Sequence, residues 1–502
     1  MEELKNLQVL QKTPTGIEGF EHLTIGGLPK GRTTLMVGSS GSGKTIFAIE
    51  FLYRGITEFN RPGVFVTFEE RAPDIVQNVK SMQWHLDELV QQGQLLFVDG
   101  SPELEPVEET GSYDLSGLIV QIKYAVEKIK AKQVVLDSIG SLFHQFSNAN
   151  VIRREIFRIT EVLKEMDVTA IMTAERLEEY GPISRYGIEE FVADNVIVLR
   201  NVLHQEKIRR TIQILKVRGS SHAQGEFPIT ISDSGIKILP LSAIELQQES
   251  SDYRITTGNE ELDQMTSGGI FHDSIFLVSG PTGSGKTLIS TMFTAAGCRN
   301  KERVLLLAYE ESRDQLLRNA RSWGIDFEPW ENDGLLRIVC TYPETMGLED
   351  HLLTVRKEIE NFRPQRLVVD SVSAMERVAS VRNFREFVIG LTSYVKKERV
   401  CSLFTSTTPQ LSGGESITEA HISTITDVIA LLRYVEVQGV MRRGIAVIKM
   451  RGSQHEKNVR EFNIDGQGLH IGLPFKNVEN IILGIPARTT LSEVDQLGDM
   501  FE

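Results

Sequence analysis

The sequence predicts an α/β protein built from two tandem domains, each with a mainly parallel central sheet flanked by helices. Three observations carry this prediction: the chain repeats itself, short apolar runs recur along each half, and longer amphipathic stretches separate several of those runs. A length of 502 residues also exceeds what one hydrophobic core normally organises.

The internal repeat defines the two halves. "TGIEGFEHLTIGGLPKGRTTLMVGSSGSGKT" begins at Thr15 and "TGNEELDQMTSGGIFHDSIFLVSGPTGSGKT" at Thr257, a shift of 257 − 15 = 242. "VVLDS" and "LVVDS", which contain Asp137 and Asp370, are related by a shift of 233. Repeats of this length are whole domains, not short stacked units. We expect domains over residues 1–240 and 254–485, a linker over 241–253 and a short acidic tail over 486–502.

Buried strands are predicted at "TTLMVG", "GVFVTF", "QVVLDS", "VTAIMTA" and "NVIVLR". These runs have no polar alternation, as expected when both faces of a strand are covered. "LSGLIVQIKYAVEKIKA" has apolar residues at helical spacing. Strands that alternate with helices indicate a parallel sheet with right-handed crossovers.

Composition narrows the class of protein. A net charge of −14 disfavours a non-specific binder of nucleic acid or of anionic membranes. The three cysteines are too few and too widely spaced to indicate disulfides or a zinc site. The start has no signal-peptide core and no run is long enough to span a membrane, so a cytoplasmic protein is expected.

Two phosphate-binding loops are the strongest motifs. "GSSGSGKT" (38–45) and "GPTGSGKT" (280–287) satisfy G-x-x-x-x-G-K-[ST], each between an apolar strand and a helix-compatible run. Glycines let backbone amides face phosphate oxygens, the helix N-terminus adds positive potential, and the lysine reaches the terminal phosphates. Lys44 and Lys286 are therefore predicted to bind ATP, and the hydroxyls of Thr45 and Thr287 to bind Mg²⁺.

Carboxylates at strand ends complete the predicted metal and catalytic groups. Asp137 and Asp370 end apolar strands, where they can hold Mg²⁺ through water, although a single such Asp can also cap a helix. The pairs Glu69–Glu70 and Glu310–Glu311 follow other strands, and one member of each pair is predicted to accept a proton from a nucleophile. The alternative is a solvated helix start, where acids are favoured by the dipole.

Two pairs of cations recur in the repeat. Lys216 with Arg218, and Lys449 with Arg451, alternate along strand-like segments and share a face. These cations can protect an edge strand from pairing with another chain. The interpretation that we prefer is that they reach a nucleotide held by the next subunit. Trp323 is either an adenine-stacking residue or a core residue.

With these parts in place, the chain strongly resembles the KaiC family of circadian-clock proteins, which are tandem RecA-like ATPases. The resemblance runs from "TPTGIEGF" to "ENIILGIPAR" and includes both P-loops, both glutamate pairs, "YEESRDQLLRNA", "SITEAHISTITD" and "KMRGS". It implies a double-ring homohexamer with ATP between subunits, a slow ATPase in the first half, and in the second half a reversible serine/threonine autokinase. The implied cofactors are ATP and Mg²⁺, with Glu310 as a further metal ligand.

The resemblance places the phosphoacceptors at Ser423 and Thr424, with Thr418 as an auxiliary hydroxyl. The repeat gives an independent check, because a shift of 233 sets Ser423 against Glu190 and Thr424 against Phe191. The first half thus has the nucleotide motifs without the acceptors, a difference that divergent packing could also produce. The full set assigned to ATP is Ser40, Gly41, Ser42, Gly43, Lys44, Thr45, Lys216, Arg218, His222, Thr282, Gly283, Ser284, Gly285, Lys286, Thr287, Trp323, Arg443, Lys449, Arg451 and His455.

Partners and competing functions follow from the same residues. The tail after "GIPART" is short and acidic, which disfavours dependence on a KaiA-type activator, whereas a KaiB-like partner is expected. RecA-type recombinases and helicases share this fold but need basic or aromatic DNA-contacting loops, which we do not find. A signalling scaffold that uses ATP only to set its conformation is the other alternative.

Overall fold

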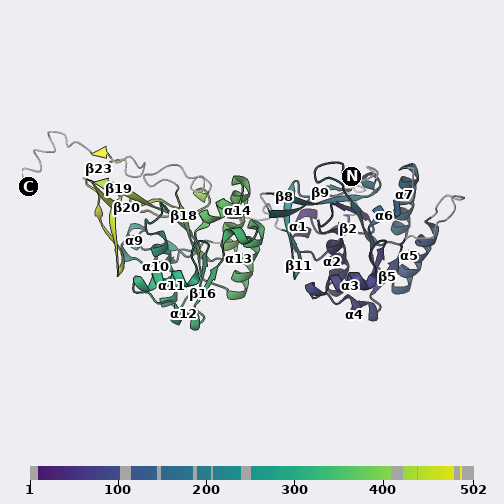
Figure 1. Ribbon diagram of the computed structural model, residues 1–502, viewed down its shortest axis with the longest axis horizontal. Helices are drawn as coiled ribbons and strands as arrows, with labels where there is room; N and C mark the ends of the chain where they lie inside the picture. Colours follow the sequence, from purple (N-terminus) through teal and green to yellow (C-terminus); the bar gives the residue numbers. More distant parts are fainter. Residues whose placement is uncertain are drawn as a thin grey trace, which may run out of the picture. The chain divides into compact units, whose positions relative to one another are not determined.

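The computed structural model describes residues 10–101, 115–143, 149–184, 189–204, 207–238, 250–408, 422–437, 439–476, 478–479 and 487–488. The chain forms two compact units, Met1–Ala243 and Ile244–Glu502 (Figure 1). Residues 241–249 of the predicted linker, Thr418 and the predicted tail other than 487–488 lie outside the described residues. None of the helices in the described ranges is long and apolar enough to cross a membrane.

The first unit is organised around a nine-stranded sheet in the order β11-β10-β9-β8-β3-β7-β6-β4-β5. The six strands from β8 to β5 are parallel, and β9, β10 and β11 extend the sheet in antiparallel fashion. The strands are β3 (Thr33–Gly38), β4 (Gly63–Thr67), β5 (Leu95–Asp99), β6 (Gln133–Asp137), β7 (Thr169–Glu175), β8 (Asn195–His204), β9 (Lys207–Val217), β10 (Glu226–Ser232) and β11 (Gly235–Ile238), with a separate pair β1 (Lys12–Thr13) and β2 (Leu28–Pro29). The helices are α1 (Phe20–Thr24), α2 (Lys44–Thr57), α3 (Ala72–Asn78), η2 (Lys80–Met82), α4 (Leu86–Gln91), α5 (Ser116–Ile129), α6 (Ile139–Phe143), α7 (Ala149–Glu165) and α8 (Glu189–Val192).

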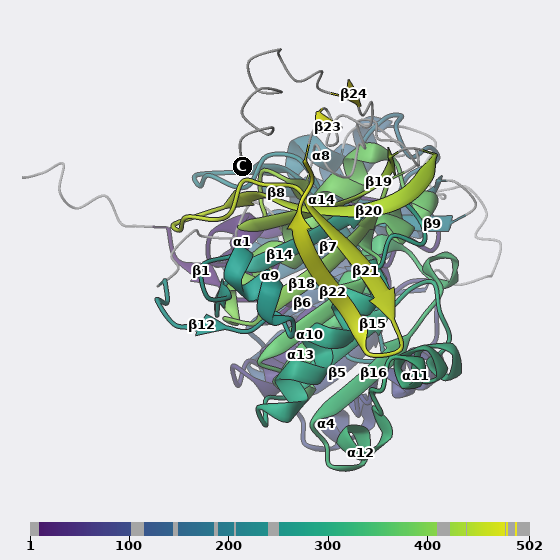
Figure 2. The ribbon, with the colours of Figure 1, turned by 90° about the vertical axis from the view of Figure 1, so that its left-hand side faces the viewer.

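The second unit repeats this topology, with the sheet order β16-β15-β17-β18-β14-β19-β20-β21-β22. In Figure 2 this unit faces the viewer, and the antiparallel β21–β22 hairpin is drawn in yellow. The strands are β14 (Ile275–Gly280), β15 (Val304–Ala308), β16 (Leu336–Cys340), β17 (Arg366–Asp370), β18 (Cys401–Thr407), β19 (Val428–Val437), β20 (Val440–Met450), β21 (Arg460–Asp465) and β22 (Gly468–Pro474), with the short pairs β12 (Arg254–Ile255), β13 (Ile270–Phe271), β23 (Val478–Glu479) and β24 (Ala487–Arg488). The helices are α9 (Glu260–Met265), α10 (Lys286–Arg299), α11 (Arg313–Ser322), α12 (Glu328–Asn332), η4 (Pro343–Thr345), α13 (Leu348–Phe362), η5 (Val372–Val378) and α14 (Val381–Lys397).

Burial explains why the central strands are continuously apolar. In β3, Leu35 and Val37 enter one core cluster together with residues of α5 and α7, and Met36 enters another with residues of α2. Both faces of the strand are therefore covered, as the parallel part of such a sheet requires. The five predicted strands and the predicted helix α5 are confirmed, and so is the α/β class. The strand-like segments predicted at Lys216 and Lys449 lie in β9 and β20, but their antiparallel pairing was not predicted.

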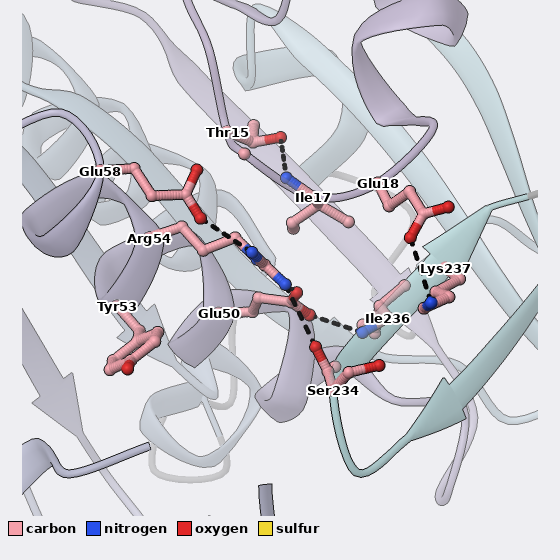
Figure 3. Close-up of polar contacts among 12 residues, drawn as sticks. Thr15, Ile17, Glu18, Glu50, Tyr53, Arg54, Glu58, Ser234, Ile236 and Lys237 are labelled. Carbon is pink, nitrogen blue, oxygen red and sulfur yellow. Dashed lines mark hydrogen bonds and ion pairs between the residues drawn. The ribbon is translucent and has the colours of Figure 1, made fainter. Parts of the chain in front are cut away.

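A buried carboxylate ties the P-loop helix of the first unit to the β10–β11 hairpin (Figure 3). Glu50 on α2 has no exposed surface, accepts a hydrogen bond from the Ile236 amide at 2.7 Å and pairs with Arg54 Nε at 2.7 Å. Arg54 also donates to the Ser234 carbonyl oxygen at 3.1 Å. Burial raises the pKa of the Glu50 carboxyl, against the opposing effect of these hydrogen bonds. The second unit has Met292 at the equivalent position (50 + 242), so only the first uses a polar tie there.

The glycines that face these two side chains give a stability test. Gly235 has φ +106°, and a Cβ there would lie 2.4 Å from Glu50 Oε1, whereas Gly468 has φ +117° and its nearest neighbours are the flexible Met292 tip atoms at 3.8 Å. We expect Gly468→Ala to cost about 1–2 kcal/mol from backbone strain alone. Gly235→Ala adds the clash and should cost about 2–5 kcal/mol. Hydrogen exchange in urea, followed on peptides of each unit, measures the loss in the free energy of unfolding for each variant. Equal losses in the two variants would contradict the clash at Gly235.

Candidate nucleotide-binding sites

Both P-loops join a central strand to a helix and have the same internal contacts. Lys44 Nζ donates to the carbonyl oxygens of Gly38 and Ser39, each at 2.9 Å. Lys286 Nζ does the same to Gly280 and Pro281, also at 2.9 Å. Burial lowers the pKa of both lysines, and nearby carboxylates oppose that shift. The backbone φ values near +73° and +99° at Gly41 and Gly43 explain why glycine stands at these positions.

The predicted metal ligands lie beside the P-loop helices. In the first unit Thr45 Oγ1 donates to Asp137 Oδ2 at 2.8 Å, and Thr173 donates to the other oxygen. In the second, Thr287, Ser290 and Thr405 donate to Asp370. Burial raises the pKa of both aspartates, and the hydroxyls oppose the shift by bonding to the charged form.

These ligands fit Mg²⁺ held largely by a nucleotide. No group of three or more His, Cys, Asp or Glu side chains among the described residues forms a metal cage of its own. A magnesium ion bound through one carboxylate, one hydroxyl and substrate phosphates needs no such cage. The hard oxygen donors of Thr45 and Asp137 therefore suit the predicted cofactor in the first unit.

The carboxyl ends of the parallel strands form the wall of the first site. The strand order β3-β7-β6-β4 sets the P-loop, Glu175, Asp137 and Glu69 in sequence along this edge. The resulting cavity has a volume of about 220 Å³. Its lining consists of Ser40, Gly41, Lys44, Thr45, Thr67, Glu69, Glu70, Asp137, Ser138 and Glu175.

The two carboxylates of each glutamate pair have different hydrogen-bond partners. Ser138 Oγ lies 3.4 Å from Glu69 and Ser371 Oγ lies 3.0 Å from Glu310. The second members are Glu70 and Glu311, which accept hydrogen bonds from Asn78 and Asn319 on the following helices at 3.1 and 3.2 Å. The first glutamate of each pair thus contacts the serine that directly follows the predicted metal-ligand aspartate.

The two second-unit glutamates also differ in charge environment. Arg377 donates to Glu310 Oε1 at 2.9 Å. Burial, followed by the charge of Asp370, raises the pKa of the Glu311 carboxyl. The pair therefore contains one ion-paired carboxylate and one that favours its protonated form more than usual.

The predicted trans-acting cations lie next to the predicted phosphoacceptors of their own chain. Lys449 Nζ donates to the carbonyl oxygens of Ser423 at 2.5 Å and Thr426 at 2.6 Å. Arg451 donates to the Thr424 carbonyl oxygen at 2.6 Å and lies 3.6 Å from Asp427. In the first unit, Lys216 donates to the Glu190 and Ala193 carbonyl oxygens, and Arg218 lies 3.5 Å from Asp194. The same cation pair thus holds the equivalent turn in both units.

This turn and the P-loop lie at opposite edges of the same sheet. Asp427 precedes β19, and its backbone amide donates to Ile275, the first residue of β14, whereas the P-loop follows Gly280 at the other end of β14. Six residues of strand separate the two edges by about 17 Å. Within one chain, Ser423 and Thr424 therefore lie on the edge away from Lys286.

The remaining predicted residues are distributed between the two edges. His222 follows β9 beside Arg218 and its Nδ1 lies 3.1 Å from the Ala223 carbonyl oxygen; His455 follows Arg451 in the equivalent segment. Arg443 is on the P-loop side, since its guanidinium lies over Tyr434, whose hydroxyl approaches Gly283. Trp323 is the C-cap residue of α11 and packs, partly buried, against the core.

The sequence reading missed several polar groups around the first P-loop. Arg210, the counterpart of Arg443 at a shift of 233, donates to the Gly41 carbonyl oxygen at 3.0 Å. Glu179 accepts hydrogen bonds from the Ser39 hydroxyl and, at 3.2 Å, from the Asn201 amide. Glu175 ends β7 directly beside Gly38. Glu175 directly follows the predicted strand "VTAIMTA", and this position at the end of a strand was the available signal.

Fold and sites together define a P-loop ATPase with two RecA-like domains. The family model for the KaiC ATPase matches residues 13–243 and again residues 255–474. The chain is 55% identical over 496 residues to the circadian clock protein KaiC3 of Synechocystis sp., with 98% of each chain covered. It is 54% identical over 490 residues to the circadian clock oscillator protein KaiC of Synechococcus elongatus, covering 98% of this chain and 94% of that protein. The chain belongs to the KaiC family of circadian clock proteins.

The Thr45–Asp137 contact gives a test of metal-dependent binding. Thr45→Ala removes the hydroxyl on the metal side of α2, so we expect Mg²⁺-dependent ATP affinity at the first site to fall about ten- to hundredfold. Thr57→Ala on the same helix is the matched control, because the Thr57 hydroxyl only bonds the Tyr53 carbonyl oxygen at 2.9 Å. Titration with a fluorescent ATP analogue in a Lys286→Ala background measures the first site. Equal affinity in the two variants would remove Thr45 from the metal site.

Proposed function

We propose that the second domain transfers the γ-phosphoryl group of ATP to Ser423 and Thr424 of a neighbouring copy, and that the first domain hydrolyses ATP slowly. The assembly would be a homohexamer with ATP at the subunit interfaces, and the phosphorylation would be reversible. Such a particle would act as a timing or signalling core with a KaiB-like partner.

One observation carries the proposal that the transfer takes place between chains. The acceptor pair lies at the edge of the sheet opposite the P-loop of its own domain, about 17 Å away along β14. Transfer requires the reacting atoms to approach to about 3–3.5 Å. A second copy that presents its acceptor edge to this P-loop edge satisfies that requirement without unfolding either domain.

The chemistry is divided between the two copies. One copy would supply Lys286, Thr287 and Asp370 to hold ATP·Mg²⁺ and Glu310 to accept the hydroxyl proton. The other supplies the Ser423 or Thr424 hydroxyl. The acceptor oxygen forms the new bond to the γ-phosphorus, the bond to the bridging oxygen breaks, and ADP leaves with that electron pair.

The two cations belong to the same chain as the acceptors and contact the acceptor turn. Lys449 and Arg451 bind the carbonyl oxygens of the acceptor turn, so they would reach the neighbouring nucleotide together with the hydroxyls. There they would stabilise the transferring phosphoryl group, as an arginine supplied in trans does. In the first domain, Glu69 or Glu70 would activate water instead.

A mixing experiment tests transfer between chains. Lys286→Ala chains keep their acceptors without a working second site, and Ser423→Ala/Thr424→Ala chains keep the site without acceptors. When either variant is incubated by itself, residues 423 and 424 should remain unphosphorylated. When the two variants are mixed, Ser423 and Thr424 of the Lys286→Ala chains should become phosphorylated. Mass spectrometry after incubation with ATP·Mg²⁺ identifies the modified chain. If the protein without substitutions hydrolyses ATP normally but carries no phosphate on Ser423 or Thr424, the kinase proposal is contradicted.

The division within the glutamate pair gives a second test. Glu310→Gln removes the carboxylate beside Ser371, and we expect autophosphorylation to slow about 10²- to 10⁴-fold. Glu311→Gln should have a smaller effect, because the Glu311 carboxylate is bonded to Asn319 on α11. Time courses of phosphosite labelling compare the two. A full rate for Glu310→Gln would exclude Glu310 as the base.

A further inference from the structure

We propose that Glu175 orients the attacking water in the first nucleotide site, and that Thr407 at the equivalent place in the second leaves room for a protein hydroxyl. These two residues would therefore set which nucleophile each site uses. The inference rests on the function proposed above and adds a specificity-determining residue to each site.

The sheet places Glu175 on the far side of Asp137 from Glu69. Glu175 ends β7, which lies between the P-loop strand β3 and β6, whereas Glu69 follows β4 on the other side of β6. The backbone of Glu175 is in register with Gly38, and its half-buried side chain lines the nucleotide cavity. Burial lowers the pKa of Lys44, and Glu175 is the charged group that opposes this shift most. Two carboxylates thus flank the metal-ligand aspartate on the same cavity wall.

The number of O–H bonds on the nucleophile explains why two carboxylates are useful. Water has two O–H bonds, and acceptors on both fix its orientation so that a lone pair faces the γ-phosphorus. In the proposed step the water oxygen bonds to that phosphorus and the bond to the bridging oxygen breaks, with its electron pair leaving on ADP. One proton passes to Glu69, and Glu175 accepts a hydrogen bond from the other O–H.

The second site has a different arrangement at the same strand end. Thr407 ends β18 beside Gly280, and a shift of 232 sets it against Glu175. Its amide donates to Ser373 Oγ at 2.9 Å, Ser373 lies 3.0 Å from Ser371, and Ser371 lies 3.0 Å from Glu310. This chain of hydroxyls ends on the proposed base.

The hydroxyl chain is specific to the second site. The first has Gly140 where the second has Ser373 (140 + 233), so this link is missing from its sequence. A serine or threonine nucleophile has one O–H, which Glu310 accepts, and a carbon in place of the other hydrogen. A second carboxylate would stand where that carbon must fit, and the smaller, neutral Thr407 avoids the conflict.

The first arm of the test measures hydrolysis at the first site in full-length chains that carry Lys286→Ala. Glu175→Gln keeps the size and Glu175→Thr copies the second site. Both should lower kcat for ATP hydrolysis roughly tenfold to a hundredfold, with KM and the affinity for a fluorescent ATP analogue within about threefold. A purely structural role would change KM and affinity together with kcat, or change nothing, and either result overturns the inference.

The second arm measures partition at the second site in chains that carry Lys44→Ala. With [γ-³²P]ATP, the ratio of released phosphate to label on Ser423 and Thr424 should rise about tenfold for Thr407→Glu and much less for Thr407→Gln. If Ser423 and Thr424 are still labelled and the ratio of released phosphate to label is the same in both variants and the parent, the inference is overturned. Loss of all labelling in the Lys44→Ala parent would instead contradict the proposed kinase function itself.

Discussion

The common direction of the central strands is the constraint on which the rest of this molecule depends. Because six neighbouring strands run parallel in each domain, their carboxyl ends gather the P-loop, the predicted metal-ligand aspartate and the glutamates at one edge. Their amino ends gather the turn that precedes β19 or β8 at the other. Within one domain, the edge with the P-loop and the edge with this turn are therefore separated by the length of the strands. Under the proposed transfer between chains, association of two copies would bring these two edges together.

The turn at the second edge is held by a charge cluster that both domains share. Asp427 pairs with Lys396 at 3.0 Å, and Asp194 pairs with the equivalent residue Lys164 at 3.5 Å. A common scaffold of this kind lets one copy of the repeat acquire hydroxyls at Ser423 and Thr424 while the other has Glu190 and Phe191. The difference in chemistry then lies in a few side chains, not in the fold.

Much of this architecture was predictable from the sequence, for identifiable physical reasons. The central strands are apolar on both faces, and the P-loops have fixed spacing, so β3, α2 and the class of fold followed directly. The antiparallel extensions did not follow, because an apolar pattern along the chain gives neither the direction of a strand nor its neighbour in the sheet. Glu175 was missed for a related reason. It has no motif of its own, and its place beside the P-loop comes from the sheet order, which a linear sequence does not give.

Phosphorylation of the acceptor turn would act on the cations that hold it. Each phosphate adds a charge of about −1.5 to −2, and the turn already contains Asp427 within 3.6 Å of Arg451. Lys449 and Arg451 now bind neutral carbonyl oxygens, so a phosphate on Ser423 or Thr424 would compete for them and would repel Asp427. The same two cations are those proposed to stabilise the transferring phosphoryl group in the neighbouring site. Under this mechanism, modification would alter both the conformation of the turn and the supply of positive charge to the next nucleotide, which couples the state of one copy to the activity of its neighbour.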